Sequence, residues 1–280
     1  MVDGDRVSDA RTIDGAPATV LELLTADDPA SWLRRLARSD AGRHDLRAVT
    51  LLAPIPLPPH DLIALGLNYV EHVPETAAAT RQSTPPARPI LFGKAGSSVI
   101  GPDGEIRFDR AVTKEVDWEV ELAVVIGRRG RDLTAGEALD HVFGYTIAND
   151  VSARDLQFLE GRQWYRGKSL DTFCPLGPWI VTRDDLGDAR GLRISLRVNG
   201  ETKQSASTDQ LLFGVPAIIA SASSGRTLYP GDVILTGTPS GVGFTRTPPQ
   251  FLRDGDVVEA EVERVGVLRN SVRETSSAEN

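Results

Sequence analysis

The 280-residue chain contains 40% apolar and 25% charged residues, proportions that are ordinary for a globular protein and argue against long disorder. Its formal net charge is −8, without clustered lysine and arginine, which argues against nucleic acid as a partner. Cys174 is the only cysteine, so no disulfide can form within the chain, and this favours a reducing compartment. The polar start MVDGDRVSDARTIDG lacks the apolar segment of a signal peptide, and no apolar run approaches the about 18 residues of a membrane span. We therefore expect a cytoplasmic protein that binds neither membranes nor nucleic acid.

Residues 1–56 are predicted to form a small N-terminal α/β module. Asp3-Gly4 and Asp14-Gly15 are dipeptides typical of hairpin turns. Asp28-Pro29 predicts the start of a helix that runs to about Arg38, with aspartate as N-cap and proline in the first turn. The proline-rich stretch 53–59 then predicts a linker to the rest of the chain.

Residues 57–273 are predicted to form one β-rich catalytic domain, followed by a polar tail at 274–280. Strands are expected over 116–127, 145–148 and 233–236, and the Pro- and Ala-rich segment 77–89 is expected to be a mobile loop. Helices are expected to be short, one capped by Ser152 and another at 216–224 that ends at Gly225. Because long helices do not alternate with the strands, the pattern indicates an α+β fold with a mixed or antiparallel sheet, not a Rossmann fold.

Two glutamates lie in the path of a predicted core strand. On a strand, Glu119 and Glu121 share one face, about 7 Å apart at Cα. That face continues as Ala123 and Val125, and the opposite face is apolar as well, so both faces are predicted to be buried. Two adjacent buried anions require protonation, ion pairing or a cation. From this segment alone, a cation site and a half-exposed edge strand with solvated glutamates remain equal alternatives.

Asp150 is the third candidate ligand, because it follows the strand predicted at 145–148. Three carboxylates together with water suit Mg²⁺ or Mn²⁺. The histidines do not indicate a zinc site, since the four in this chain are scattered without ligand spacing: His44, His60, His72 and His141.

Five motifs, in this order, resemble the fumarylacetoacetate hydrolase family. They are Gly66–Glu75 (GLNYVEHVPE), Glu119–Glu121 (EVE), Asn149–Gln157 (NDVSARDLQ), Gly167–Ser169 (GKS) and Leu235–Gly243 (LTGTPSGVG). The resemblance covers roughly residues 60–272. It implies that family's mixed β-sandwich or β-roll catalytic domain, and the first 56 residues resemble the small N-terminal domain of many bacterial members.

The resemblance assigns roles to particular residues. Glu119, Glu121 and Asp150 match the metal ligands, which implies one Mg²⁺ or Mn²⁺ per chain. Lys168 matches a lysine that would neutralise the anionic substrate. Substrate contacts are implied for four further residues, Thr238, Gly237, Gln157 and Arg154. For Arg154, a structural ion pair with Asp155 or Asp171 is an equal alternative.

His72 and Glu75 match a His-x-x-Glu dyad that activates water or moves a proton in many members. Their spacing places both side chains on one helical face. Pro74 separates them and is tolerated only in a first helical turn, so the helix is expected to begin near His72 or Pro74.

The resemblance implies an enzyme that binds a small anionic 2-oxo acid through a metal-stabilised enolate. We expect hydrolysis of a C–C bond in an acylpyruvate-like substrate. The alternatives are decarboxylation of a 2-oxo diacid such as oxaloacetate, isomerisation of a 2-hydroxymuconate-type diacid, and a non-catalytic binding protein with the same fold. One of four arginines is expected to bind a second substrate carboxylate: Arg81, Arg88, Arg162 or Arg166. No organic cofactor is expected, because the chain lacks both a Gly-x-Gly-x-x-Gly turn after a strand and a Walker lysine. A homodimer is implied.

Overall fold

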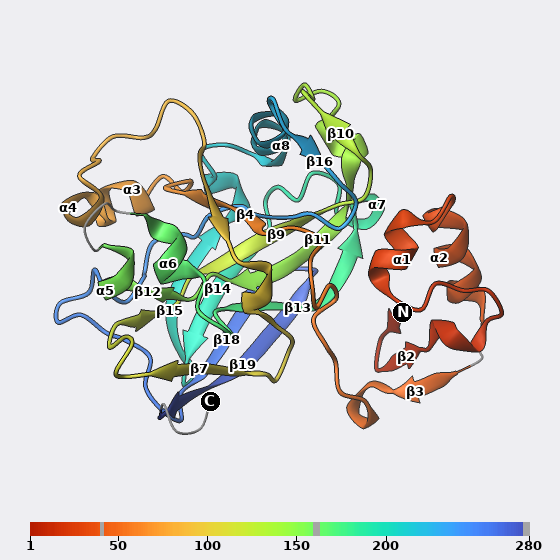
Figure 1. The fold of residues 1–280 in the computed structure, drawn as a ribbon, viewed down its shortest axis with the longest axis horizontal. Coiled ribbons are helices and arrows are strands. Elements are labelled where there is room, and N and C mark those ends of the chain that lie inside the picture. The colour runs from red at the N-terminus through yellow and green to blue at the C-terminus, as the bar shows by residue number, and fades with distance from the viewer. Residues whose placement is uncertain (40–41, 159–162, 277–280) are drawn as a thin grey trace.

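The computed structural model describes residues 1–39, 42–158 and 163–276. The first part of the chain forms a small unit to one side of the main body (Figure 1). It combines an antiparallel sheet of β1 (Val2–Asp3), β2 (Arg6–Ser8) and β3 (Arg43–Asp45) with the helices α1 (Val20–Thr25) and α2 (Pro29–Arg38).

The helix predicted to begin at Asp28-Pro29 is confirmed. Asp28 is its N-cap and accepts a hydrogen bond from the backbone N–H of Ser31 at 2.8 Å. Of the two predicted hairpin turns, Asp3-Gly4 does join the paired strands β1 and β2. The prediction for Asp14-Gly15 was wrong, because this turn lies between a 3-10 helix (Ala10–Thr12) and α1.

A seven-stranded sheet forms the centre of the molecule. Its order is β5 (Ile90–Lys94), β4 (Leu62–Gly66), β17 (Val233–Leu235), β9 (Val120–Ile126), β11 (Val142–Asn149), β13 (Cys174–Thr182) and β6 (Val99–Ile100). The pairs β17–β4 and β13–β6 are parallel and the other pairs are antiparallel. The expected mixed sheet is therefore confirmed.

A five-stranded sheet packs against the first. Its order is β15 (Glu201–Ser207), β14 (Arg193–Val198), β18 (Val257–Val262), β19 (Gly266–Thr275) and β7 (Glu105–Asp109), with only β19 and β7 parallel among these pairs. Leu122 and Val124 of β9 share one core with Leu196 of β14 and Ala260 of β18. Strand β19 also takes up Glu274 and Thr275, which the sequence had placed in the polar tail.

The central strand β9 is buried on both faces, as the sequence predicts. Ala123 and Val125 belong to a second core on the outer side of the sheet, together with Ala53 and Ile55. The proline-rich stretch is thus packed on the sheet and does more than link two units. Because β9 lies between β17 and β11, the alternative of a solvated edge strand is excluded. The predicted single strand over 116–127 is interrupted, since β8 (Val116–Asp117) ends before β9 begins.

Four short helices gather beside one end of the central sheet (Figure 1). These are α3 (His72–Glu75), α4 (Ala77–Thr80), α5 (Arg154–Gln157) and α6 (Trp164–Lys168). The prediction that Ser152 caps α5 was wrong. The Ser152 hydroxyl donates to the carbonyl of Asp150, and Ala153 is the N-cap of the helix. The segment 77–89 begins with α4 and is otherwise without helix or strand.

The remaining elements are α7 (Arg183–Leu186), α8 (Val215–Ser223), β10 (Gly130–Arg131), β12 (Ser152–Ala153) and β16 (Thr227–Leu228). Gly225 follows the C-cap of α8 with a positive φ, as predicted for that helix end. Within the described ranges, no helix has the length and apolar character needed to cross a bilayer.

Candidate active site

Three buried carboxylates meet where β9 and β11 lie side by side. Glu119 immediately precedes β9, Glu121 lies within it, and Asp150 follows the last residue of β11. The two strands are antiparallel with Glu121 opposite Ala148, and the Asp150 N–H donates to the Glu119 carbonyl at 2.8 Å. One oxygen from each of the three side chains lies within 4.8 Å of the others. Strand pairing therefore assembles the predicted ligand trio.

Two lysines and one arginine compensate the charge of this trio. Lys168 Nζ lies 2.8 Å from Glu119 Oε2 and 2.7 Å from Asp150 Oδ2. Lys94 Nζ lies 2.7 Å from Asp150 Oδ1, and Arg154 Nη1 lies 2.7 Å from Glu119 Oε1. All these groups are buried, and Glu119 and Asp150 each have two cationic partners at short range.

The trio's two glutamates have different electrostatic surroundings. Burial alone would raise the pKa of Glu119, but the charges of Lys168 and Arg154 outweigh it and lower the pKa to about 2. The pKa of Glu121 is raised well above its usual value, first by burial and then by the neighbouring charges of Asp150 and Glu119. Among the described residues, Glu121 is therefore the candidate ligand without a direct ion pair, and the charge of Lys168 only partly offsets the rise in its pKa.

The trio fits a hard divalent cation. Glu121 Oε2 accepts the N–H of Gly237 at 2.5 Å, whereas Oε1 is buried and has no hydrogen-bond partner within the described residues. A cation would satisfy that oxygen and would compete with a proton for the same carboxylate. All three ligands offer oxygen, the donor that Mg²⁺ and Mn²⁺ prefer.

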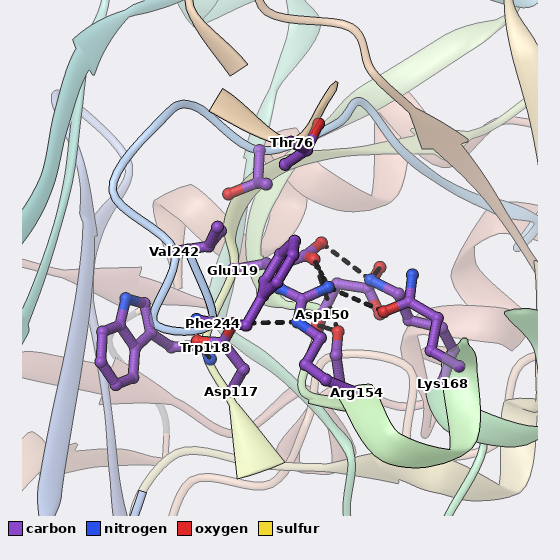
Figure 2. A network of polar contacts seen from close by, with 12 residues as sticks. Thr76, Asp117, Trp118, Glu119, Asp150, Arg154, Lys168, Val242 and Phe244 are labelled. Atoms are coloured by element: carbon purple, nitrogen blue, oxygen red, sulfur yellow. Dashed lines mark hydrogen bonds and ion pairs between the residues drawn. The ribbon is translucent and has the colours of Figure 1, made fainter. Parts of the chain in front are cut away.

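Arg154 connects the trio to a fourth buried carboxylate, that of Asp117. Figure 2 shows its guanidinium between Asp117 and Glu119, and Nε donates to Asp117 Oδ2 at 2.8 Å. Nη1 also donates to Gln157 Oε1 at 2.8 Å. The proposed pairing with Asp155 was wrong, because that carboxylate accepts from Thr113 Oγ1 and the Lys114 N–H. Arg154 Nη2 is buried and has no hydrogen-bond partner within the described part of the chain.

One pocket brings most of the predicted residues together. Its lining includes six of them: His72, Glu119, Arg154, Gln157, Lys168 and Thr238. Four aromatic side chains also line it: Phe92, Phe158, Trp164 and Phe244. Among the described residues of the lining, Arg154 is the only arginine. Three of the arginines expected to bind a second carboxylate are exposed and do not line this pocket (Arg81, Arg88 and Arg166), and Arg162 lies outside the described residues.

The His72–Glu75 pair is formed. His72 Nδ1 lies 2.8 Å from Glu75 Oε2, and His72 is buried. Helix α3 begins at His72, so Pro74 falls within its first turn, as predicted. Because the carboxylate accepts the Nδ1 proton, Nε2 is left as the basic nitrogen of the ring.

Thr238 and Gly237, for which substrate contacts were predicted, form hydrogen bonds with other residues of the protein. Thr238 Oγ1 donates to the Val120 carbonyl at 3.0 Å and accepts from Gln204 Nε2 at 2.8 Å. The Gly237 N–H had been expected to face a substrate anion, but it binds Glu121. Gly237 therefore orients a metal-ligand candidate.

Sequence reasoning missed three buried polar residues that hold the site: Lys94, Asp117 and Gln204. Lys94 ends the apolar strand β5, and Asp117 lies two residues before the first of the two glutamates. For Lys94 and Asp117, the sequence did offer a signal, because a charged residue at the end of an apolar segment indicates a buried polar contact. Gln204 lies in an otherwise polar strand and gave no such signal.

Residues 61–273 match the pattern of the family described as "Fumarylacetoacetate (FAA) hydrolase C-terminal". The chain belongs to the fumarylacetoacetate hydrolase family. It is similar to the rat mitochondrial oxaloacetate tautomerase Fahd2a, with 45% identity over 96% of this chain and 84% of that protein. It is also similar to the oxaloacetate tautomerase YisK of Bacillus subtilis, with 37% identity over 97% of this chain and 94% of that one.

A solved structure agrees with this assignment. The 2-hydroxyhepta-2,4-diene-1,7-dioate isomerase of Mycobacterium marinum has a TM-score of 0.72 and 42% identity, covering 85% of this chain and 83% of that one. The expected fold and the expectation of an enzyme are thus confirmed: the chain is an enzyme of the fumarylacetoacetate hydrolase family. The relatives' names favour isomerisation and oxaloacetate chemistry over the C–C hydrolysis that we had preferred.

Proposed function

We propose that this enzyme is a Mg²⁺- or Mn²⁺-dependent tautomerase that interconverts the enol and keto forms of oxaloacetate or a closely similar 2-oxo diacid. The observation that carries the proposal is that His72, which is paired with Glu75, lines the same pocket as Glu119 and Lys168. A group able to move a proton thus lies in the same small space as the candidate metal site. The two tautomerase relatives, which cover nearly the whole chain, support the choice of substrate.

The metal would be held by Glu119, Glu121 and Asp150. A bound divalent cation would supply Lewis-acid chemistry, drawing electrons from the 2-oxo acid so that a proton is more easily lost from the neighbouring carbon. Lys168 places a positive charge beside the same carboxylates and lines the pocket, where it attracts an anionic substrate.

His72 would move the proton. Glu75 holds the Nδ1 proton, so Nε2 can accept a proton from C3 of the keto form and return it to C3 of the enol form. In the enol-to-keto direction the 2-hydroxyl oxygen loses one proton to solvent while C3 gains one, and in the keto-to-enol direction both transfers are reversed, so no net proton is consumed. No water is consumed and no carbon–carbon bond breaks, which distinguishes this reaction from hydrolysis and from decarboxylation.

Arg154 supports a substrate with two carboxylates. Its Nε and Nη1 are used by Asp117, Glu119 and Gln157, whereas the buried Nη2 lacks a partner within the described residues. Because a buried unsatisfied donor is costly and Arg154 lines the pocket, a substrate oxygen is a suitable partner. We assign the second carboxylate to this nitrogen.

A 2-hydroxymuconate-type diacid is the second candidate substrate. The isomerase from M. marinum favours it by name, and its reaction is also a proton shift from an enol. The aromatic lining formed by Phe92, Phe158, Trp164 and Phe244 would suit its longer unsaturated chain.

A substrate panel tests the proposal. Purified protein with Mg²⁺ or Mn²⁺ is given enol oxaloacetate, 2-hydroxyhepta-2,4-diene-1,7-dioate and an acylpyruvate, and NMR identifies the products. Loss of the ultraviolet absorbance of the enol, with oxaloacetate conserved and no pyruvate or CO₂ formed, is the expected result. Faster cleavage of the acylpyruvate would restore C–C hydrolysis as the main activity.

A further inference from the structure

The carboxylate of Glu75 is held from two sides. Its Oε2 faces His72, and its Oε1 accepts two hydrogen bonds from the other side. The donors are the Gly241 N–H at 2.8 Å and the Thr245 hydroxyl at 2.9 Å. Both belong to residues 241–245, which we call the 241–245 loop.

The 241–245 loop is fixed in turn by Asp117. Asp117 Oδ1 accepts the Gly243 N–H at 2.7 Å, and Oδ2 accepts the Phe244 N–H at 3.1 Å. Asp117 is fully buried, and its Oδ2 also accepts Arg154 Nε. Figure 2 shows Asp117 and Arg154 with Val242 and Phe244 of the loop beside them. The Arg154 guanidinium lies over the Phe244 ring, 4.4 Å from its centroid.

Two glycines make this close approach possible. A Cβ at Gly241 would lie 2.1 Å from the Lys203 carbonyl oxygen, and φ at Gly241 is +106°. A Cβ at Gly243 would lie 2.6 Å from Asp117 Oδ1. At Gly243 a Cβ would also lie 2.0 Å from the Gln250 carbonyl oxygen, so a side chain at either glycine would displace the loop from its neighbours.

We propose that the 241–245 loop positions the proton-transfer dyad, with Thr245 holding Glu75 and Asp117 holding the loop. The proposal rests on the proposed function for the role of His72. In this arrangement Glu75 cannot rotate away from His72 without losing two hydrogen bonds, so Nε2 keeps one orientation. Asp117 orients Arg154 and the loop with the same carboxylate, and it thereby links the substrate-binding side of the pocket to the dyad.

Thr245→Val is the first test, because it removes the hydroxyl and preserves the shape of the side chain. We expect kcat for oxaloacetate tautomerisation to fall roughly 10- to 100-fold, the size associated with one hydrogen bond to a charged group. KM and the Mg²⁺ dissociation constant should stay within a factor of two, because Thr245 touches neither the trio nor Arg154. Thr245→Ser, which keeps the hydroxyl, should restore kcat. Amide hydrogen exchange over residues 72–76 should be faster in Thr245→Val than in the wild type.

Thr182→Val is the matched control. Thr182 Oγ1 donates to Asp185 Oδ2 at 2.7 Å, the same kind of hydrogen bond on another part of the surface. Its kcat should equal that of the wild type. If Thr245→Val left both kcat and the exchange rates unchanged while His72→Ala was inactive, the positioning role would be refuted and the proposed function would stand.

Asp117→Asn tests the other end of the loop. Asparagine offers one acceptor oxygen where aspartate serves several donors, so we expect kcat to fall and KM to rise as Arg154 loses its orientation. Combined with Thr245→Val, the loss in kcat should be smaller than the product of the two single losses, because both act through one loop. Independent, multiplicative losses would show that Asp117 does not act on the dyad. If Asp117→Asn does not fold, the comparison of Thr245→Val with Thr245→Ser still decides the proposal.

The substrate assignment can fail separately. If oxaloacetate is not turned over, the same variants are measured with whichever substrate of the panel reacts, since the dyad is required for proton transfer or water activation in each case. Hydrogen exchange over residues 72–76 needs no substrate. An unchanged exchange rate together with unchanged kcat on the active substrate would overturn the role of the loop.

Discussion

Lys94 and Asp150 form an ion pair in which neither side chain is exposed to solvent, with Nζ 2.7 Å from Oδ1. The same ammonium donates to the carbonyls of Val151 and Lys168. Lys94 thus ties β5 to a candidate metal ligand and to the last residue of α6. Its role is to fix two groups of the site relative to each other.

Replacing Lys94 by methionine should destabilise the protein severely. The substitution leaves the Asp150 carboxylate with one cationic partner fewer and leaves two buried carbonyls without their donor. We expect a loss of about 3–5 kcal/mol in the free energy of unfolding, the range found when one partner of a buried pair is removed. Urea unfolding in EDTA measures it. Lys114→Met, at an exposed position, should change the same quantity by less than about 0.5 kcal/mol; an equal loss in both variants would mean that the pair has no special role.

The double variant Glu119→Gln with Glu121→Gln should lose metal binding. Two of the three anionic ligands become neutral while their size is kept, so Mg²⁺ or Mn²⁺ should no longer raise the melting temperature. Differential scanning fluorimetry with and without the metal checks this. The control variant Glu201→Gln with Glu259→Gln removes the same amount of charge from the five-stranded sheet. It should keep the full increase in melting temperature on adding the metal. Full metal-dependent stabilisation in the first variant would show that the site lies elsewhere.

Metal removal should cost more stability at pH 8 than at pH 5.5. The pKa of Glu121 is raised above its ordinary value of 4.5 in the metal-free fold, chiefly by burial. A group whose folded pKa is raised stabilises the fold fully below its unfolded pKa, and this contribution is lost as pH rises toward the folded pKa. A bound cation takes the place of that proton and removes the loss. The drop in melting temperature on adding EDTA, measured across this pH range, should therefore grow with pH; a drop independent of pH would contradict the raised pKa.

His72→Ala should lower kcat by about 10²–10⁴-fold, the usual range for loss of a general base. Binding of oxalate, an inhibitor that chelates the metal, should persist because the trio and Lys168 are untouched. Isothermal titration calorimetry with oxalate, alongside steady-state kinetics, separates the two effects. Arg11→Ala, in the N-terminal unit, serves as a control with expected wild-type kcat. An unchanged kcat in His72→Ala would place the base on another residue.

Segment 69–85 is expected to become more protected when oxalate binds. Pro74 limits α3 to a single turn, and α4 is equally short, so this part of the pocket wall has few backbone hydrogen bonds of its own. Hydrogen exchange with and without oxalate measures the change. Equal protection in both states would indicate a fixed wall.

The sequence predicted those features of the site that leave a local pattern. The alternation around Glu119 and Glu121 showed a strand buried on both faces, and the spacing of His72 and Glu75 showed one helical face. Contacts between distant segments left no such pattern. Arg154 could equally have paired with the neighbouring Asp155, but it pairs with Asp117, which lies 37 residues earlier.

The break between β8 and β9 was also invisible in the sequence. Trp118 continues the apolar alternation, so nothing local indicates that pairing stops there. The break depends on Asp117, whose Oδ1 accepts the Trp118 N–H and also the N–H of Gly243, 126 residues later. Such a contact becomes predictable only when the packing of the two segments is known.

The outer face of the central sheet is covered by residues that come from the leading part of the chain. Leu24, Ala53 and Ile55 share one core with Ala123 of β9 and Leu235 of β17. On this outer face, the strand that carries Glu121 is shielded from water in part by a segment that lies before residue 61, where the family's shared region begins. Without that segment, Ala123 and Leu235 would lose part of the cover that separates this face of the sheet from water.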